Sequence, residues 1–238
     1  MKMKIRPLDW IFPRRCPGCG ELTDREARHW CWGCFQKQEL FPQRGGCERC
    51  GLQIEGGVTH EFVCDVCRSH PPHFDRARAA ADFKGHLREA ILAFKYQDAM
   101  WMRRDFADLL EGAAKTHFQT AAVDVVIPVP LHAVRQRARS FNQSALLAET
   151  LAQRMDRRCD TRSLVRTRET ASQTKLNAAQ RRENIAGAFR VARPEWVAQR
   201  CVLLVDDVMT TGATLDECAR ALKRAAARTV LYSYNWTV

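Results

Sequence analysis

Apolar residues recur through the last two thirds of this chain in two alternating patterns, one typical of strands and the other typical of helices. Residues 202–205 (Val-Leu-Leu-Val) are four apolar residues in a row, which favours a strand buried on both faces of a parallel sheet. Further strands are predicted over residues 76–83, 123–130, 162–165, 188–191 and 229–234. Helices are predicted over residues 84–95, 102–117, 144–154, 177–184 and 215–228. The alternation indicates an α/β fold, a parallel sheet flanked by helices.

The polar residues that follow the strand at 202–205 form the main candidate site. They are Asp206 and Asp207, then the turn Thr210, Thr211, Gly212, Ala213 and Thr214. Ligands of open parallel sheets bind at the carboxyl ends of strands, and a helix N-terminus favours a phosphate. The stretch therefore predicts two carboxylates for sugar hydroxyls beside a cradle for a phosphate. The plainer alternative is an ordinary strand, turn and capped helix.

Positive charge is concentrated in the middle of the chain. The net charge is +11, and residues 133–200 hold 15 Lys/Arg, 14 of them Arg, against 6 Asp/Glu. Arg135, Arg137 and Arg139 alternate in the loop between a predicted strand and helix, with Asn142 and Gln143 at the helix start. Arginine suits phosphate, so this loop predicts a second anion site, suited to a pyrophosphate. Exposed arginines beside a helix cap are the alternative.

A second loop, residues 166–176, is polar and lacks apolar periodicity. Long loops of this kind in compact domains are often lids over a site. Its cations, such as Arg168 and Lys175, are further candidates for contact with a pyrophosphate.

Eight of the eleven cysteines lie before residue 70, in four Cys-x-x-Cys pairs. The pairs are Cys16 and Cys19, Cys31 and Cys34, Cys47 and Cys50, and Cys64 and Cys67. Two such pairs complete a tetrahedral zinc site, so the spacing predicts two structural zinc ions. Sequential ligand sets are the simplest, and interleaved pairing is the alternative. A disulfide framework is a third interpretation, but the chain shows no export signal. We expect a zinc module over residues 1–72 and an α/β domain over residues 73–238.

The totals are those of a globular protein, with 238 residues, 46% apolar and 27% charged. No apolar run approaches the ~20 residues that span a bilayer. The basic start lacks the apolar segment of a signal peptide. We therefore expect a cytoplasmic protein.

The stretch from residue 202 to Thr214 resembles the phosphoribosyl pyrophosphate (PRPP) motif of type I phosphoribosyltransferases. Four other features surround it in a fixed order. They are the Cys-x-x-Cys pairs, residues 83–91 with Lys95, residues 127–132 with 139–143, and the loop 166–187. This order resembles the ComF family (ComFC/GntX-type), which consists of competence-associated phosphoribosyltransferase-like proteins with a double zinc ribbon.

The resemblance implies a type I phosphoribosyltransferase-like domain that binds PRPP with Mg²⁺. Asp206 and Asp207 would hold the ribose hydroxyls. The 5′-phosphate and pyrophosphate would contact Thr210, Thr211, Gly212, Ala213, Thr214, Arg137, Arg139 and Lys175. The chain would then transfer the phosphoribosyl group to an acceptor that the motifs do not name. The alternative is a non-catalytic module that binds single-stranded DNA and works with DNA-uptake proteins.

Overall fold

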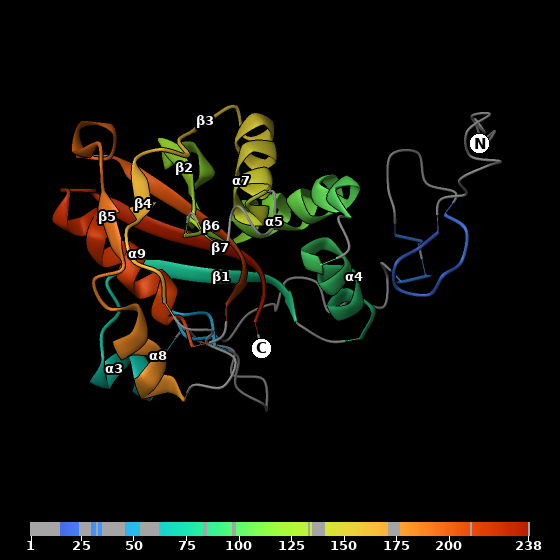
Figure 1. Cartoon of the computed structure of the whole chain (residues 1–238), viewed down its shortest axis with the longest axis horizontal. Coiled ribbons are helices and arrows are strands. Elements are labelled where there is room, and N and C mark those ends of the chain that lie inside the picture. The colour runs from blue at the N-terminus through green and yellow to red at the C-terminus, as the bar shows by residue number, and fades with distance from the viewer. Residues whose placement is uncertain are drawn as a thin grey trace.

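The computed structural model describes residues 15–23, 30–31, 33–34, 46–52, 62–82, 85–96, 99–132, 134, 141–170, 177–209 and 211–237. A five-stranded sheet lies at its centre, in the order β1-β7-β6-β2-β3, and every neighbouring pair is parallel (Figure 1). The strands are β1 (Arg76–Asp82), β2 (Val125–Pro128), β3 (Arg158–Cys159), β6 (Cys201–Met209) and β7 (Thr229–Thr237). The parallel sheet predicted from the sequence is confirmed.

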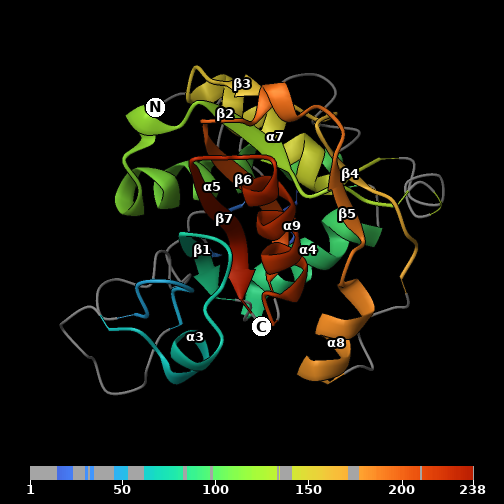
Figure 2. The ribbon, with the colours of Figure 1, turned by 90° about the vertical axis from the view of Figure 1, so that its left-hand side faces the viewer.

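Helices cover both faces of this sheet. The first face carries α4 (Gly85–Tyr96), α5 (Arg103–His117) and α7 (Gln143–Arg154). The second carries α9 (Ala213–Arg224), which also contacts α8 (Ala178–Ile185) and β5 (Phe189–Val191); β5 pairs antiparallel with β4 (Leu164–Arg166). Figure 2 shows α9 in front of β6 and β7, with α5 and α7 behind them. Among the helices of the described part of the chain, none has the length and apolar character needed to cross a membrane.

Shorter elements complete the described chain. They are α3 (Asp65–Ser69) and the 3-10 turns η1 (Met100–Met102), η2 (Thr120–Ala122) and η4 (Pro194–Trp196).

Strand β6 shows why four consecutive apolar residues mark a central strand. Val202 and Leu204 pack into the core on the α9 side, whereas Leu203 and Val205 pack into the core on the α5 and α7 side. All four side chains are fully buried. Because successive side chains point to opposite faces, only a strand covered on both faces needs an unbroken apolar run.

The strand is longer than its apolar run predicts. We expected it to end at the two acids, but β6 continues through Asp206 and Asp207 to Met209. The reason lies in its two neighbours: β2 stops at Pro128, opposite Val205, whereas β7 stays paired with β6 as far as Met209. The acid pair therefore lies beyond the end of β2 while β7 still holds its backbone.

The two cysteine-rich segments pack against different parts of the α/β domain. Trp30, which is 3% exposed, meets the ring of Phe106 on α5 edge-to-face at 6.4 Å between centroids. The second segment covers the outer edge of β1, where the Ala77 backbone N–H donates to the Arg49 carbonyl at 2.7 Å. Gly51 approaches β1 so closely that a Cβ there would lie 2.8 Å from the Ala77 carbonyl oxygen. The second segment therefore caps a sheet edge that would otherwise have unpaired backbone groups.

Candidate functional site

The eight cysteines of the four Cys-x-x-Cys pairs form two clusters of four, with the sequential pairing. The first cluster is Cys16, Cys19, Cys31 and Cys34, and the second is Cys47, Cys50, Cys64 and Cys67. Within each cluster the four sulfur atoms lie within 4.8 Å of one another. All eight are free thiols in this structure, as are Cys159, Cys201 and Cys218.

The geometry of both clusters fits a zinc ion. The Sγ atoms of Cys19 and Cys31 are 3.6 Å apart, and those of Cys50 and Cys64 are 3.8 Å apart. A tetrahedron with Zn–S bonds of ~2.3 Å has edges of about 3.8 Å. Burial raises the pKa of Cys47, but backbone hydrogen bonds from Cys64, Cys50 and Arg49 outweigh it and lower that pKa to about 7. Four thiol ligands leave no open position, so these sites are structural rather than catalytic.

The acid pair lies in a polar, partly buried site at the carboxyl end of β6. Asp206 Oδ1 accepts hydrogen bonds from Ser144 Oγ at 2.8 Å and from the Asp207 backbone N–H at 2.9 Å. Asp207 Oδ2 lies 3.0 Å from Lys95 Nζ. Both side chains of this ion pair are largely buried, with 17% of Lys95 and 13% of Asp207 exposed.

Some of the groups around Asp206 raise its pKa, and others lower it. Burial, and then the negative charge of Asp207, raise the pKa of Asp206 to about 7. The hydrogen bond from Ser144 and the charge of Lys95 oppose this rise. A carboxyl group poised near neutral pH in such a place is typical of functional sites.

Directly after β6, the turn at Gly212 leads into the N-terminus of α9. Gly212 has φ 73°, in the left-handed region that favours glycine, and Ala213 is the first residue of the helix. Thr211 is exposed and Thr214 is partly buried. Backbone N–H groups at the start of α9 therefore lie near the acid pair in the chain, as a phosphate cradle requires. Thr210 lies outside the described residues.

The start of α7 contributes a second wall of the site. Asn142 caps the helix by accepting from the Ser144 backbone N–H at 3.1 Å, and its side-chain amide donates to the Val129 carbonyl at 3.2 Å. This cap fixes Ser144 opposite Asp206. Arg137 and Arg139, which we expected in the loop just before, lie outside the described residues.

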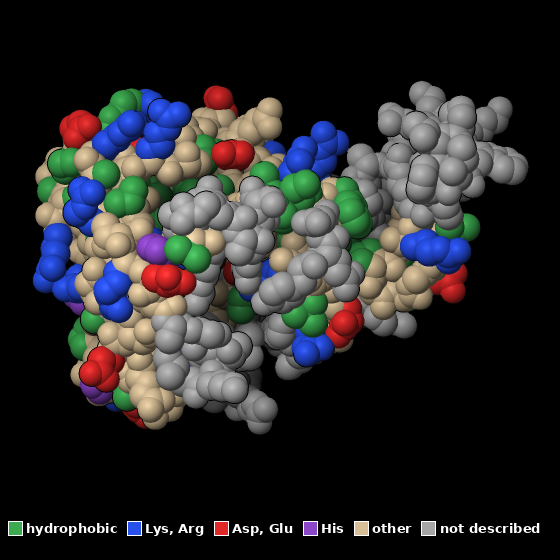
Figure 3. All heavy atoms as spheres, viewed as in Figure 1, with side chains coloured by type: hydrophobic (Ala, Val, Ile, Leu, Met, Phe, Trp, Pro, Cys, Tyr) green, Lys and Arg blue, Asp and Glu red, His purple; other side chains and the backbone are tan. Residues whose placement is uncertain are grey.

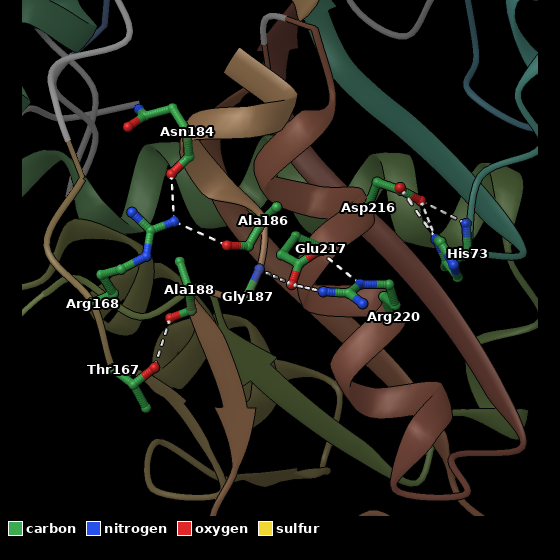
Figure 4. Close-up of polar contacts among 10 residues, drawn as sticks. All are labelled: His73, Thr167, Arg168, Asn184, Ala186, Gly187, Ala188, Asp216, Glu217 and Arg220. Atoms are coloured by element: carbon green, nitrogen blue, oxygen red, sulfur yellow. Dashed lines mark hydrogen bonds and ion pairs between the residues drawn. The ribbon is translucent and has the colours of Figure 1, made fainter. Parts of the chain in front are cut away.

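Two acids in the first turns of α9 tie distant parts of the chain to the helix (Figure 4). Asp216 accepts from the backbone N–H of His73 at 2.6 Å. Glu217 accepts from the backbone N–H of Gly187 at 2.8 Å and from Arg220 Nε at 2.8 Å. Through Gly187, Glu217 therefore anchors the segment between α8 and β5 to α9. The loop 166–176, which we expected to act as a lid, precedes α8.

Arg168 closes the near end of the same loop. One of its guanidinium nitrogens donates to the carbonyls of Asn184 at 2.8 Å and Ala186 at 2.9 Å (Figure 4). These two bonds tie Arg168 to the C-terminal end of α8, so the structure gives Arg168 partners other than a pyrophosphate. Lys175 lies outside the described residues.

Two residues of this site were not identified as such from the sequence. Ser144 appeared only as the start of a predicted helix, and Lys95 appeared only as the end of one and as part of a family resemblance. Ser144 is 62 positions from Asp206 in the chain. Only the position of Ser144 in the chain could have pointed to it. Helix α7 follows strand β2, which neighbours β6, and residues at the carboxyl ends of neighbouring parallel strands lie close together.

Two family models match this chain. A model described as Double zinc ribbon domain matches residues 7–68, and one described as Phosphoribosyl transferase domain matches residues 142–231. Together with the parallel sheet and the two cysteine clusters, they define the class. The fold is that of a phosphoribosyltransferase with an N-terminal double zinc ribbon.

Relatives narrow the class to a family. The chain is 32% identical over 220 residues to Competence protein F of Haemophilus influenzae, covering 90% of this chain and 93% of that protein. It is 35% identical over 190 residues to DNA utilization protein YhgH of Escherichia coli O6:H1, covering 77% and 80%. The chain belongs to the ComF family, which contains these proteins. Among solved structures, purine phosphoribosyltransferase from Pyrococcus horikoshii aligns at 15% identity and a TM-score of 0.34, over 58% of this chain and 88% of that one.

Proposed function

We propose that this chain binds PRPP together with Mg²⁺ at the carboxyl end of β6. The observation that carries the proposal is the order of groups along one short stretch. Two adjacent carboxylates, Asp206 and Asp207, are followed at once by a glycine turn and the N-terminus of a twelve-residue helix. A sugar phosphate likewise carries vicinal hydroxyls and a phosphate on one ribose.

Each group in the site has a role in this proposal. Asp206 and Asp207 accept hydrogen bonds from the ribose 2′- and 3′-hydroxyls. The 5′-phosphate takes the hydrogen bonds offered by residues 210–214 and the dipole of α9. Arg137, Arg139 and Lys175 are proposed to face the pyrophosphate.

The contacts of the acid pair support a Mg²⁺ ion carried by the ligand rather than by a protein cage. Ser144 already donates to Asp206, and Lys95 already pairs with Asp207. Mg²⁺ commonly keeps several waters and binds substrate phosphates directly. When bound, it would neutralise charge on the pyrophosphate.

The proposed reaction is transfer of the phosphoribosyl group to an acceptor nucleophile. The bond from ribose C1 to the pyrophosphate oxygen breaks, a bond from C1 to the acceptor forms, and pyrophosphate leaves. Positioning and charge stabilise the oxocarbenium-like transition state, so no protein nucleophile is needed.

Calorimetric titration of Mg²⁺–PRPP into the full-length zinc-loaded chain tests the proposal. We expect saturable binding in the wild type and its loss in an Asp206→Asn/Asp207→Asn double variant. Asp156→Asn is the matched control, because Asp156 is exposed and has φ 52°, which Asn tolerates. Absence of wild-type binding, or equal binding in both variants, would contradict the proposal.

A second candidate function is binding of single-stranded DNA, and a different surface favours it. The guanidinium of Arg158 lies over the ring of Trp196 at 3.5 Å from its centroid, and that of Arg200 lies at 5.7 Å. Lys and Arg side chains gather over the end of the molecule where Figure 1 draws β3, β4 and β5 (Figure 3). Among the aromatic residues of the segment 133–200, Phe189 is buried, whereas Trp196 is only partly so. An aromatic ring interleaved with nearby cations is the combination that sequence-tolerant single-strand binding surfaces use to stack bases.

Fluorescence anisotropy with a labelled thymidine oligonucleotide tests this second function. We expect affinity that falls steeply with salt, and a loss of about 1–3 kcal/mol of binding free energy in Trp196→Ala. Trp101→Ala is the matched control, because Trp101 is 53% exposed on another element, η1. Equal loss in the two variants would count against the Trp196 surface.

A further inference from the structure

The ion pair between Lys95 and Asp207 brings a cation to the acid pair from a distant part of the chain. Lys95 is the penultimate residue of α4, and its Nζ lies 3.0 Å from Asp207 Oδ2. The stretch matched by the phosphoribosyltransferase family model is residues 142–231, so α4 lies outside it. The site is thus completed by a helix that precedes the matched domain.

The structure holds Lys95 in this position from two sides. Its neighbour Phe94 is 1% exposed and packs edge-to-face against Phe106 at 5.1 Å and against Phe141 at 6.5 Å. The backbone carbonyl of Lys95 accepts from Gln143 Nε2 at 3.4 Å, and Gln143 is itself 2% exposed. A buried aromatic anchor and a bond from α7 therefore set where the lysine side chain begins.

Two adjacent carboxylates in a partly buried site repel one another. The proposed function needs both as acceptors, because a protonated carboxyl group offers fewer lone pairs to a ribose hydroxyl. Burial and mutual repulsion favour a proton on one of them, and a nearby cation opposes that proton. Among the described residues, Lys95 is the cation that forms an ion pair with one of the two acids.

We infer that Lys95 is a positioning residue, whose charge favours the form of the pair in which Asp206 and Asp207 are both ionised and can both accept the ribose hydroxyls. The role for the ligand rests on the proposed function, whereas the effect on the charge of the pair does not.

The groups that face the pair come from four elements. Lys95 comes from α4 and Ser144 from α7, and Asp206 and Asp207 belong to β6 itself. From α9 comes the buried thiol of Cys218, whose pKa is raised well above its usual value, first by burial and then by the charge of Asp206. A neutral thiol and a hydroxyl add no charge, so Lys95 carries the compensating charge.

The test compares Lys95→Met, which keeps the length and removes the charge, with Lys95→Arg, which keeps the charge. Lys115→Met is the matched control, because Lys115 pairs with Glu111 at 2.6 Å but is 65% exposed. Two profiles are recorded for each full-length, zinc-loaded variant between pH 5 and 9: the affinity for Mg²⁺–PRPP, and the thermal unfolding midpoint without ligand.

In the ligand profile, we expect wild-type affinity to rise as pH increases through about 7, where Asp206 loses its proton. In Lys95→Met this rise should move up by about one pH unit, which lowers the affinity roughly fivefold at pH 7 and roughly tenfold well below that pH. Lys95→Arg and Lys115→Met should keep the wild-type midpoint. A uniform loss of affinity at every pH in Lys95→Met, with no shift of the midpoint, would overturn the inference.

The ligand-free profile separates this inference from the proposed function. The folded pKa of Asp206 lies above its unfolded value, so its stabilising contribution is complete at low pH and is lost as pH rises through about 7. Removing Lys95 should move that loss to higher pH, and adding Asp206→Asn should abolish it. If the wild type fails to bind PRPP, the proposed function falls and this profile still decides the inference. An unchanged profile in Lys95→Met would overturn it.

Discussion

The hydrogen bond from Gly187 to Glu217, which links the segment between α8 and β5 to α9, can be broken by one substitution with a calculable effect. The side chain of Glu217 is 9% exposed, and its carboxylate accepts hydrogen bonds from Gly187 and Arg220. Glu217→Ala removes the acceptor of the Gly187 N–H. Gly187 is exposed, so water can replace the lost acceptor and the loss is that of an ordinary hydrogen bond, about 0.5–1.5 kcal/mol. It also removes the ion pair with Arg220, which is 25% exposed and so contributes only about 0.5–1 kcal/mol.

The expected total for Glu217→Ala is a loss of about 1–2.5 kcal/mol in the free energy of unfolding. Glu217→Gln keeps a carbonyl oxygen for Gly187 and gives up only the charge, so we expect it to lose only the ion-pair contribution of about 0.5–1 kcal/mol. Urea unfolding at an unchanged m-value measures both numbers. Hydrogen exchange at the Gly187 amide reports whether the loop detaches before the domain unfolds.

Two results would refute this reasoning. One is a Glu217→Ala variant whose free energy of unfolding lies within about 0.5 kcal/mol of the wild type, the usual range for surface changes. The other is equal loss in the Gln and Ala variants, which would mean that the charge, and not the acceptor for Gly187, holds the loop. A double-mutant cycle with Arg220→Met separates the two contributions.

Three further predictions concern the zinc clusters and the acid pair. Elemental analysis should find two zinc ions per chain, and Cys47→Ser should retain only one of them. Gly51→Ala should reduce the free energy of unfolding by about 1–3 kcal/mol more than Gly20→Ala. Both glycines have a positive φ, but only Gly51 faces a backbone oxygen. Equal effects of the two substitutions would contradict the packing of the second cluster on β1. Asp206→Asn should flatten the decline in stability as pH rises from about 4 to 7, since the raised pKa of this carboxyl is the cause, and an unaltered pH dependence would show that another group titrates.

Most of the fold followed from local patterns. The apolar run at 202–205 predicted a strand covered on both faces, because only such a strand needs apolar side chains at consecutive positions. The Cys-x-x-Cys spacing predicted two four-cysteine clusters, because each turn presents two thiols to one metal. The helix predicted over residues 102–117 is α5, Arg103–His117. Strand β3 was not predicted, because two residues paired only with β2 leave no periodic signal.

The surroundings of the site could not be predicted to the same degree. The acids and the glycine turn are contiguous, so one motif contains them. Their partners come from elsewhere: Ser144 lies on α7 and Lys95 on α4, and only the packing of both helices on the same face of the sheet brings them together. Even the end of β6 depended on a distant partner, since β7 extends it past the acids.

These long-range contacts also show how much of the chain is needed to build the site. Residues 142–231 carry the acid pair, the turn at Gly212 and helix α9, but not β1, α4 or β2. Without β2, β6 would lose its neighbour on one side; without β1, β7 would become an edge strand with unpaired backbone groups. Without α4, Asp207 would lose the cation that offsets its charge. The matched stretch therefore holds the acid pair and the glycine turn, while the segment before it completes the sheet and supplies the cation that pairs with Asp207.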